Sequence, residues 1–320
     1  MAKHVDKIAI LLKTYIGDID YVKKLIGSFK KYNKDKITLY IVVPKSDIKQ
    51  FKKFTSNNIK LLSDESVTNE LVHDSSIRGI RPGYINQEII KLSFWEKGLC
   101  ENYFCMDSDG VFIRNFYISD FMYDENVPFT ILKEDNEFIV DPEYFRTHWR
   151  GREKLIKKIQ EKLGLVDKRM LTCHGFGILS SKVLKSFYTK FLLKNHLTYK
   201  DILKISPYEF SWYNMWLQKD KTIPIEFREP LVKSFHNKTQ HWDYLRKGIK
   251  ISDIARGYIG LNINSNYSRG FGMISYQDED AYIMPLTDII FYSKKIIKSV
   301  VVQSYRKLVD SGKKVIKLIK

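Results

Sequence analysis

The chain has 320 residues, with 54 Lys or Arg against 37 Asp or Glu, which gives a formal net charge of +17. Its composition, 44% hydrophobic and 14% aromatic, is that of a globular protein and excludes an intrinsically disordered chain. A charge of this size predicts a polyanionic partner, such as nucleic acid, anionic lipid or a phosphorylated substrate. We expect no nucleic-acid partner, because the sequence has no helix-turn-helix, zinc-finger or RNA-recognition pattern.

The sequence predicts a cytoplasmic protein without a membrane span. The apolar run at residues 8–12 ends at Lys13 and is far shorter than the roughly 20 residues of a spanning helix, and no signal-peptide cleavage site follows it. The cysteines, Cys100, Cys105 and Cys173, are odd in number and lack metal-finger spacing. We expect buried thiols in a reducing compartment.

The first 62 residues alternate apolar β-rich runs with helical patterns. We expect strands at residues 7–13, 37–43 and 59–62, and helices at residues 18–32 and at 46–54, where Ser46 would be the N-cap. In the first helix, Val22, Leu25 and Phe29 share one face at helical spacing. Strand, helix and strand in alternation predict a parallel α/β arrangement.

A loop at residues 73–84 precedes an expected helix at 86–97 and an expected strand at 103–106. This strand runs directly into Asp107-Ser108-Asp109, and extended structure resumes at residues 111–113. Ligands of open α/β sheets bind at the carboxyl ends of strands, so the acidic triplet is well placed for a site.

Later elements are less regular. We expect helices at residues 151–164, 182–193 and 209–218, and a loop entering a strand at 171–179. Residues 227–271, rich in His, Asn, Arg and aromatic side chains, show little periodicity and are expected to line a site. The prediction is a mixed α/β sheet flanked by helices in a domain of residues 1–285, followed by a basic helical tail at 286–320.

The Asp-x-Asp pattern occurs at residues 18–20, 107–109 and 278–280, so the pattern alone is weak evidence. The first triplet opens a predicted helix, where acids complement the dipole, and the third lies in an acidic segment. The second follows a buried strand, and two carboxylates near a core repel each other unless a cation balances them. Asp107 and Asp109 therefore predict a Mn²⁺ or Mg²⁺ site that bridges to a diphosphate. Such an ion neutralises the charge that develops when a sugar–phosphate bond breaks.

Four stretches together resemble the GT-A-fold glycosyltransferases, and more narrowly a poorly characterised bacterial group among them. They are Ile8-Ala-Ile-Leu-Leu-Lys-Thr-Tyr15, Gly83-Tyr-Ile-Asn-Gln-Glu-Ile-Ile-Lys-Leu92, Phe104-Cys-Met-Asp-Ser-Asp-Gly-Val-Phe-Ile113 and Pro207-Tyr-Glu-Phe-Ser-Trp-Tyr213. The chain departs from the group's pattern at Glu88, where a second Gln is expected, and at residues 207–208, where a Ser is expected before the Glu.

This resemblance implies a Rossmann-like GT-A sheet and transfer of a sugar from a nucleotide-sugar to a saccharide or lipid-linked saccharide acceptor in cell-surface glycan synthesis. It implies that Asp107, Ser108 and Asp109 bind the donor, that Thr14 and Tyr15 contact its base or ribose, and that Gln87 and Lys91 approach its sugar or diphosphate. It also implies a third metal ligand late in the domain, for which His236 is the candidate and His241 the alternative.

On the acceptor side we expect Glu209 to be the general base, because aromatic neighbours at positions 208, 210, 212 and 213 would raise its pKa. The alternative is a helix N-terminal acid that binds free amides. His174, in a glycine-flanked turn, is the second catalytic candidate, with a structural histidine as the alternative. Possible phosphate-binding cations are Arg78, Arg81, Lys238, Arg246 and Arg269.

The tail at residues 294–320 contains nine Lys or Arg and one acid, Asp310. Its apolar residues recur at helical spacing, which predicts a basic amphipathic helix on the inner face of an anionic membrane. The alternative is a helix packed on the domain with a solvated cationic face.

Two other functions fit parts of the sequence. A nucleotidyltransferase would need a Gly-rich phosphate loop after the first strand, but residues 13–18 contain one glycine. A non-catalytic polyanion-binding protein would need the charge but neither Asp107 nor Asp109.

Overall fold

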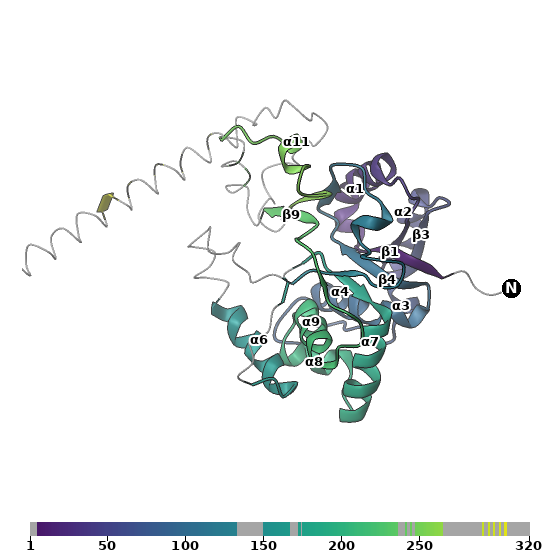
Figure 1. The fold of residues 1–320 in the computed structure, drawn as a ribbon, viewed down its shortest axis with the longest axis vertical. Coiled ribbons are helices and arrows are strands. Elements are labelled where there is room, and N and C mark those ends of the chain that lie inside the picture. The colour runs from purple at the N-terminus through teal and green to yellow at the C-terminus, as the bar shows by residue number, and fades with distance from the viewer. Residues whose placement is uncertain are drawn as a thin grey trace, which may run out of the picture. The chain divides into compact units, whose positions relative to one another are not determined.

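The computed structural model describes residues 5–132, 150–166, 172–173, 175–235, 241, 244 and 247–264, together with residues 290, 294, 297, 301, 304 and 305 (Figure 1). The chain divides into two compact units. Unit 1 comprises Met1–Lys233 and Gly257–Asn262, and unit 2 comprises Ser234–Arg256 and Ile263–Lys320. The predicted domain boundary at residue 285 lies outside the described residues and stays a prediction.

A five-stranded sheet of order β3-β2-β1-β4-β7 forms the centre of unit 1. Its strands are β1 (Asp6–Lys13), β2 (Thr38–Val43), β3 (Ile59–Ser63), β4 (Cys100–Met106) and β7 (Ile178–Ser180). The first four are parallel, with Leu12 opposite Met106, and β7 pairs antiparallel to β4. β1, β2 and β4 are nearly continuous apolar runs, as expected of parallel strands buried on both faces. The predicted mixed α/β sheet flanked by helices is confirmed.

Helices of unit 1 pack against this sheet and one another (Figure 1). They are α1 (Ile19–Tyr32), α2 (Ile48–Phe51), α3 (Asp64–Val67), α4 (Pro82–Ser93), α6 (Arg150–Lys162), α7 (Ser181–Phe187), α8 (Tyr199–Ile205) and α9 (Glu209–Asp220). α1 buries Val22, Leu25, Ile26 and Phe29, the face that periodicity predicted. α4 begins four residues before its predicted start, because Pro82 takes the first helical turn, where a missing N–H costs nothing.

Two smaller sheets complete the described strands. The first has the order β5-β10-β9, from β5 (Gly110–Phe112), β10 (Gly260–Ile263) and β9 (Val232–Phe235), and the second pairs β6 (Phe129–Thr130) with β8 (Glu226–Phe227). The expectation that residues 227–271 are irregular is therefore wrong in part, since they supply β9, β10 and α11 (Ile251–Ile254). These elements have four residues each, too few to show a clear period.

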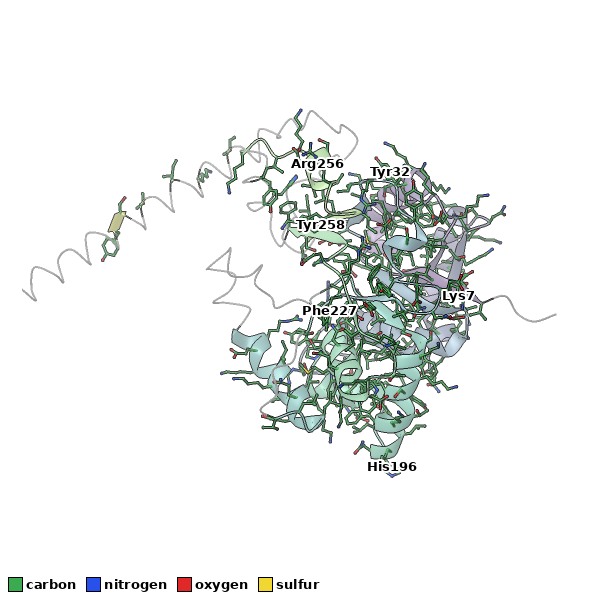
Figure 2. The ribbon with its side chains drawn as sticks, viewed as in Figure 1. Lys7, Tyr32, His196, Phe227, Arg256 and Tyr258 are labelled. Carbon is green, nitrogen blue, oxygen red and sulfur yellow. The ribbon has the colours of Figure 1, made fainter. Side chains whose placement is uncertain are left out.

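The described side chains of unit 1 fill the space between its strands and helices (Figure 2). All three cysteines are buried thiols, as expected. Among the described residues, no helix has the length and hydropathy needed to cross a bilayer.

Gly177 sits just before β7 and admits the ring of Phe210 from the first turn of α9. A Cβ at this position would lie 2.6 Å from two atoms of that ring. Gly177, the second glycine of Cys-His-Gly-Phe-Gly, therefore has a packing role, because it lets α9 approach the end of the sheet.

We predict that Gly177→Ala lowers the free energy of unfolding by about 1–3 kcal/mol, because the ring must move to make room for a methyl group. Gly27→Ala is the matched control. Gly27 is exposed within α1 with open space around its Cα, so alanine there is expected to stabilise by about 0.5–1 kcal/mol. Chemical denaturation of both variants measures the difference, and equal stabilities would contradict the packing role.

Candidate functional site

The acidic triplet lies where β4 ends and β5 begins. Oδ1 of Asp107 accepts a hydrogen bond from Nε2 of Gln87 on α4 at 3.0 Å. Oδ1 of Asp109 accepts one from Nδ2 of Asn262 on β10 at 2.5 Å. Each carboxylate is thus oriented by a neutral amide from a different element. Gln87, predicted to approach the sugar or diphosphate of the donor, thus contacts the acidic motif, and its role toward a donor stays a prediction.

Ser108, between the two carboxylates, is buried, and its hydroxyl donates to Oδ2 of Asp18 at 2.9 Å. Asp18 precedes α1 as expected, but its side chain makes no hydrogen bond that caps the helix. The side chain of Asp18 therefore connects the start of α1 to the acidic motif rather than capping the helix.

Lys91 lies on the face of α4 that carries Gln87 and Glu88, since residues three and four apart share a helix face. It is 5% exposed. Its Nζ lies 2.9 Å from Oε1 of Glu209, 3.5 Å from Oε2 of Glu88 and 3.7 Å from Oδ1 of Asp107. Lys91, predicted to bind the donor, and Glu209, predicted to be the base, therefore form an ion pair next to Asp107.

The protonation of this cluster follows from burial and charge. Burial raises the pKa of Glu88 well above its usual range, and the charge of Glu209 adds to the effect. Burial lowers the pKa of Lys91, but the carboxylates of Glu209 and Glu88 outweigh burial and hold it well above its usual value. Both shifts favour the protonated form, which is the neutral acid of Glu88 and the ammonium of Lys91.

Glu209 differs from the expectation. Burial raises its pKa, but the charge of Lys91, together with hydrogen bonds from Glu88 and Lys91, outweighs burial and brings the pKa below its ordinary value. The expectation that aromatic neighbours raise the pKa of Glu209 is wrong in direction, because a buried lysine faces the same carboxylate. Its assignment as general base stays a prediction.

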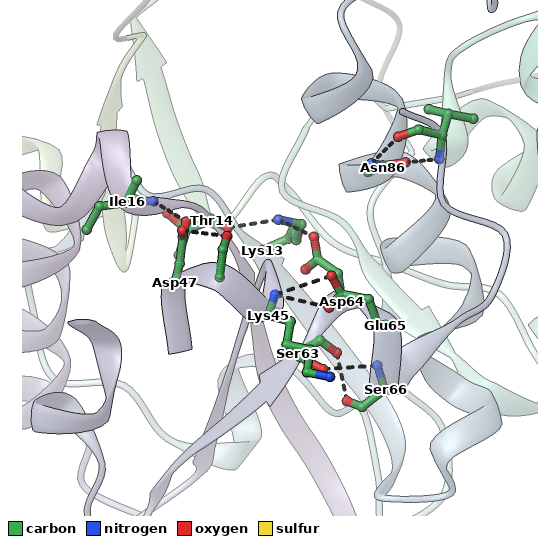
Figure 3. A network of polar contacts seen from close by, with 12 residues as sticks. Lys13, Thr14, Ile16, Lys45, Asp47, Ser63, Asp64, Glu65, Ser66 and Asn86 are labelled. Carbon is green, nitrogen blue, oxygen red and sulfur yellow. Dashed lines mark hydrogen bonds and ion pairs between the residues drawn. The ribbon is translucent and has the colours of Figure 1, made fainter. Parts of the chain in front are cut away.

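A second buried ion pair lies at the carboxyl ends of β1 and β3 (Figure 3). Nζ of Lys13 donates to the carbonyl of Thr14 at 2.8 Å and lies 3.1 Å from Oδ2 of Asp64. Burial raises the pKa of Asp64 to about 6, although Lys13 opposes the shift, and burial lowers the pKa of Lys13. Within the described part of the chain, Oγ1 of Thr14 and Oδ1 of Asp64 are buried without a hydrogen-bond partner.

The loop after β1 is held by Asp47, whose Oδ2 accepts from the backbone N–H of Ile16 at 2.8 Å (Figure 3). Ser46, predicted to be an N-cap, instead donates to Oδ1 of Asp47 at 3.0 Å. Thr14 is buried, whereas Tyr15 is 39% exposed and its ring lies over Gly17, where any Cβ would collide with it. Of the two residues predicted to contact the base, Tyr15 presents an accessible ring.

Other predicted site residues divide into two groups. His174, His236, Lys238, Arg246 and Arg269 lie outside the described residues. Of the described residues, His241 is buried in unit 2 against Phe235, and burial lowers its pKa to about 4. Nη1 of Arg78 donates to the carbonyl of Lys204 at 3.4 Å, and Arg81 is exposed at the start of α4.

The donor set at Asp107 and Asp109 fits a hard divalent cation. No three His, Cys, Asp or Glu side chains among the described residues form a metal-binding group. Mg²⁺ and similar ions, however, are commonly bound through one or two carboxylates plus substrate phosphates and water. Glu88, Glu209 and Asp107 together face one lysine, so a proton on Glu88 still leaves an excess negative charge that a cation can balance.

Asn262, Asp18 and Asp64 belong to the site and were not predicted from the sequence. Asn262 lies in a four-residue strand, and the other two act through contacts with residues far away in the sequence. The available signal was the alternation of Leu261 and Ile263 with a polar residue between them, which is the period of a strand.

Together these observations define an α/β domain with an oriented acidic pair at the end of a central parallel strand. Residues 3–223 match the model of the family described as "Family of unknown function (DUF6492)". This match spans more than half of the chain, so the chain belongs to that family.

Among solved structures, the chain is similar to mouse xyloside xylosyltransferase 1 in its apo form. The two share 10% sequence identity with a TM-score of 0.46, over 81% of this chain and 99% of the other. Among curated protein sequences, none matches the chain significantly.

We predict that Asp64 makes stability depend on pH. Because its folded pKa, about 6, exceeds the ordinary value of 3.8, the folded state binds more protons between these values. Its contribution to stability is present at low pH and is lost as pH rises through about 6, with a slope of at most about 1.4 kcal/mol per pH unit.

Asp64→Asn should flatten this dependence when the free energy of unfolding is measured by denaturant titration between about pH 4 and pH 7. Asp20→Asn, which removes an exposed carboxylate beside Lys23, is the control and should keep the slope. Identical slopes in wild type and Asp64→Asn would contradict the assignment.

Proposed function

We propose that the protein is a metal-dependent glycosyltransferase that moves a sugar from a nucleotide-sugar to a saccharide acceptor. The observation that carries the proposal is the orientation of Asp107 and Asp109 at the end of β4 by amides from α4 and β10. Oriented carboxylates with excess negative charge behind them suit a divalent cation bound together with a diphosphate.

The neighbouring strand supplies the nucleotide end of the proposed site. β1 and β4 pair in parallel with Leu12 opposite Met106, so the residues after each strand leave the same edge of the sheet. The exposed ring of Tyr15 offers a face on which a base or ribose can stack. Base and diphosphate would then lie across the ends of two adjacent strands, as is usual for ligands of α/β sheets.

In the proposed reaction the bond between the anomeric carbon and the phosphate oxygen breaks, and its electron pair stays on the diphosphate. A bond forms between the anomeric carbon and the acceptor hydroxyl, whose proton passes to a base. A bound cation would neutralise the negative charge on the departing diphosphate. Asp107 and Asp109 would hold that cation, and Gln87 fixes the carboxylate of Asp107. The sequence predicts acceptor-side roles for His174 and Glu209, but the buried contact of Glu209 with Lys91 favours a different role for Glu209.

The acceptor class follows from the sequence resemblance and the charge: a growing cell-surface glycan, free or lipid-linked. A nucleotidyltransferase would release pyrophosphate from a nucleoside triphosphate, and a polyanion-binding protein would turn nothing over. An assay of sugar release or transfer from nucleotide-sugars therefore separates both alternatives from a glycosyltransferase.

We predict that Asp109→Ala lowers the rate of sugar release or transfer from a panel of nucleotide-sugars by at least about 100-fold in the presence of Mn²⁺, because charge on the leaving group is no longer neutralised. Asp20→Ala, which removes an exposed carboxylate outside the site, is the control and should keep the wild-type rate. Equal rates for wild type and Asp109→Ala, or turnover that is unchanged when Mn²⁺ is chelated, would sink the proposal.

We also propose that the tail binds an anionic membrane surface. Ile290, Ile297, Val301 and Tyr305 are helical and 49%, 63%, 61% and 67% exposed. At about 100° per residue, their spacing places them within an arc of about 80° on one helix face. An exposed apolar stripe in a segment with nine basic residues and one acid suits an interface of acyl chains and anionic headgroups.

The substitution pair Ile297→Ser and Val301→Ser should reduce sedimentation of the full chain with phosphatidylglycerol-containing vesicles by about tenfold, because apolar burial is lost while charge is kept. Phe227→Ser changes an equally exposed apolar side chain of unit 1 (Figure 2) and should have no effect. Binding that is equal for both variants, or equal for neutral phosphatidylcholine vesicles, would refute membrane docking by the tail.

A further inference from the structure

Lys91 lies between two acids that compete for its ammonium group. Its distance to Glu209, 2.9 Å, is that of a charged hydrogen bond, whereas its distance to Asp107, 3.7 Å, is too long for one. The ammonium therefore contacts Glu209 on α9 and lies farther from the Asp107 carboxylate at the end of β4.

Both members of this pair are buried. Lys91 is 5% exposed and Glu209 is 6% exposed. The ring of Phe210 covers the ammonium at 5.2 Å, and the hydroxyl of Tyr103 fixes the backbone carbonyl of Lys91 at 2.6 Å. A donor ligand and a general base would both need access to substrate atoms, and neither side chain has it in this arrangement.

An ammonium that paired fully with Asp107 would oppose a cation there, because it would neutralise the carboxylate and its own charge would repel the ion. The oxygen of Asp107 that faces Lys91 is instead oriented by Gln87, whose amide carries no net charge.

We infer that Glu209 is a positioning residue that holds the Lys91 ammonium away from Asp107 and so keeps the Asp107 carboxylate available to a divalent cation. Gln87 then sets the orientation of the Asp107 carboxylate, and Glu209 keeps the charge of Lys91 away from it. This inference rests on the proposed function only in that a cation binds at Asp107.

The test is the affinity of the full chain for Mn²⁺ alone, measured by electron paramagnetic resonance without nucleotide or acceptor. Glu209→Gln should weaken Mn²⁺ binding by about tenfold, since Lys91 is released toward Asp107. Asp220→Asn is the matched control. It removes another carboxylate of α9 that contacts a lysine, Lys190 at 2.9 Å, outside the cluster around Lys91, and should alter the affinity by less than about threefold.

The double variant Lys91→Gln with Glu209→Gln should restore the affinity to within about threefold of wild type, because the competing ammonium is gone. It replaces a buried ion pair with two neutral side chains, a change that folds tolerate better than loss of one partner. A residue acting only as a base predicts loss of turnover in Glu209→Gln with unchanged Mn²⁺ affinity.

Wild-type affinity in Glu209→Gln, or no restoration in the double variant, overturns this inference while leaving the proposed function intact. No Mn²⁺ binding to the wild type, either alone or with a nucleoside diphosphate added, overturns both. If Glu209→Gln does not fold in a thermal unfolding assay, Lys91→Gln tests the same claim from the other side. It should bind Mn²⁺ at least as tightly as wild type, and weaker binding overturns the inference.

Discussion

The ion pair between Lys91 and Glu209 is the interaction on which the rest of the site depends. Both groups are buried, so losing either partner would leave a charge in a poorly solvated place, at a cost of about 3–5 kcal/mol. The pair fixes α4 against α9, and α4 in turn carries Gln87 to the carboxylate of Asp107. The packing of α4 on α9 and the electrostatics of the acidic motif therefore depend on the same ion pair.

The parallel order of the sheet explains why so many polar groups meet at one edge. β1, β2, β3 and β4 all run in the same direction, so Thr14, Asp64 and Asp107 each follow a strand that ends there. The structure has two buried lysine–carboxylate contacts near this edge, Lys13 with Asp64 at the ends of β1 and β3, and Lys91 on α4 with Glu209 on α9. Such pairs are poor devices for stability alone, because desolvation offsets much of their attraction. The second pair lies beside Asp107, which fits a role in binding.

Much of the fold was predictable because apolar patterns are local. The face of α1, the buried strands and the placement of Asp107 after β4 all follow from residues close together in sequence. The contact between Gln87 and Asp107 was not itself predicted, although the resemblance assigned both residues to the donor site.

The chemistry of the cluster was not predictable in the same way. Lys91 and Glu209 lie 118 positions apart, and a lysine on an amphipathic helix resembles a solvated side chain until the opposing helix is known. The same pairing reversed the expected pKa shift of Glu209. Asn262 escaped notice because its strand is too short for a period to emerge. In each case the missing information was a tertiary contact rather than a residue property.

The central claim is that Asp107 and Asp109 hold a divalent cation against a diphosphate. Anomalous diffraction at the manganese edge, from crystals grown with Mn²⁺ and a nucleoside diphosphate, tests it most directly. The account predicts one manganese peak within coordination distance of both carboxylates and of the diphosphate, with the nucleoside toward Tyr15. A nucleotide bound without metal, or manganese bound away from the end of β4, would contradict it.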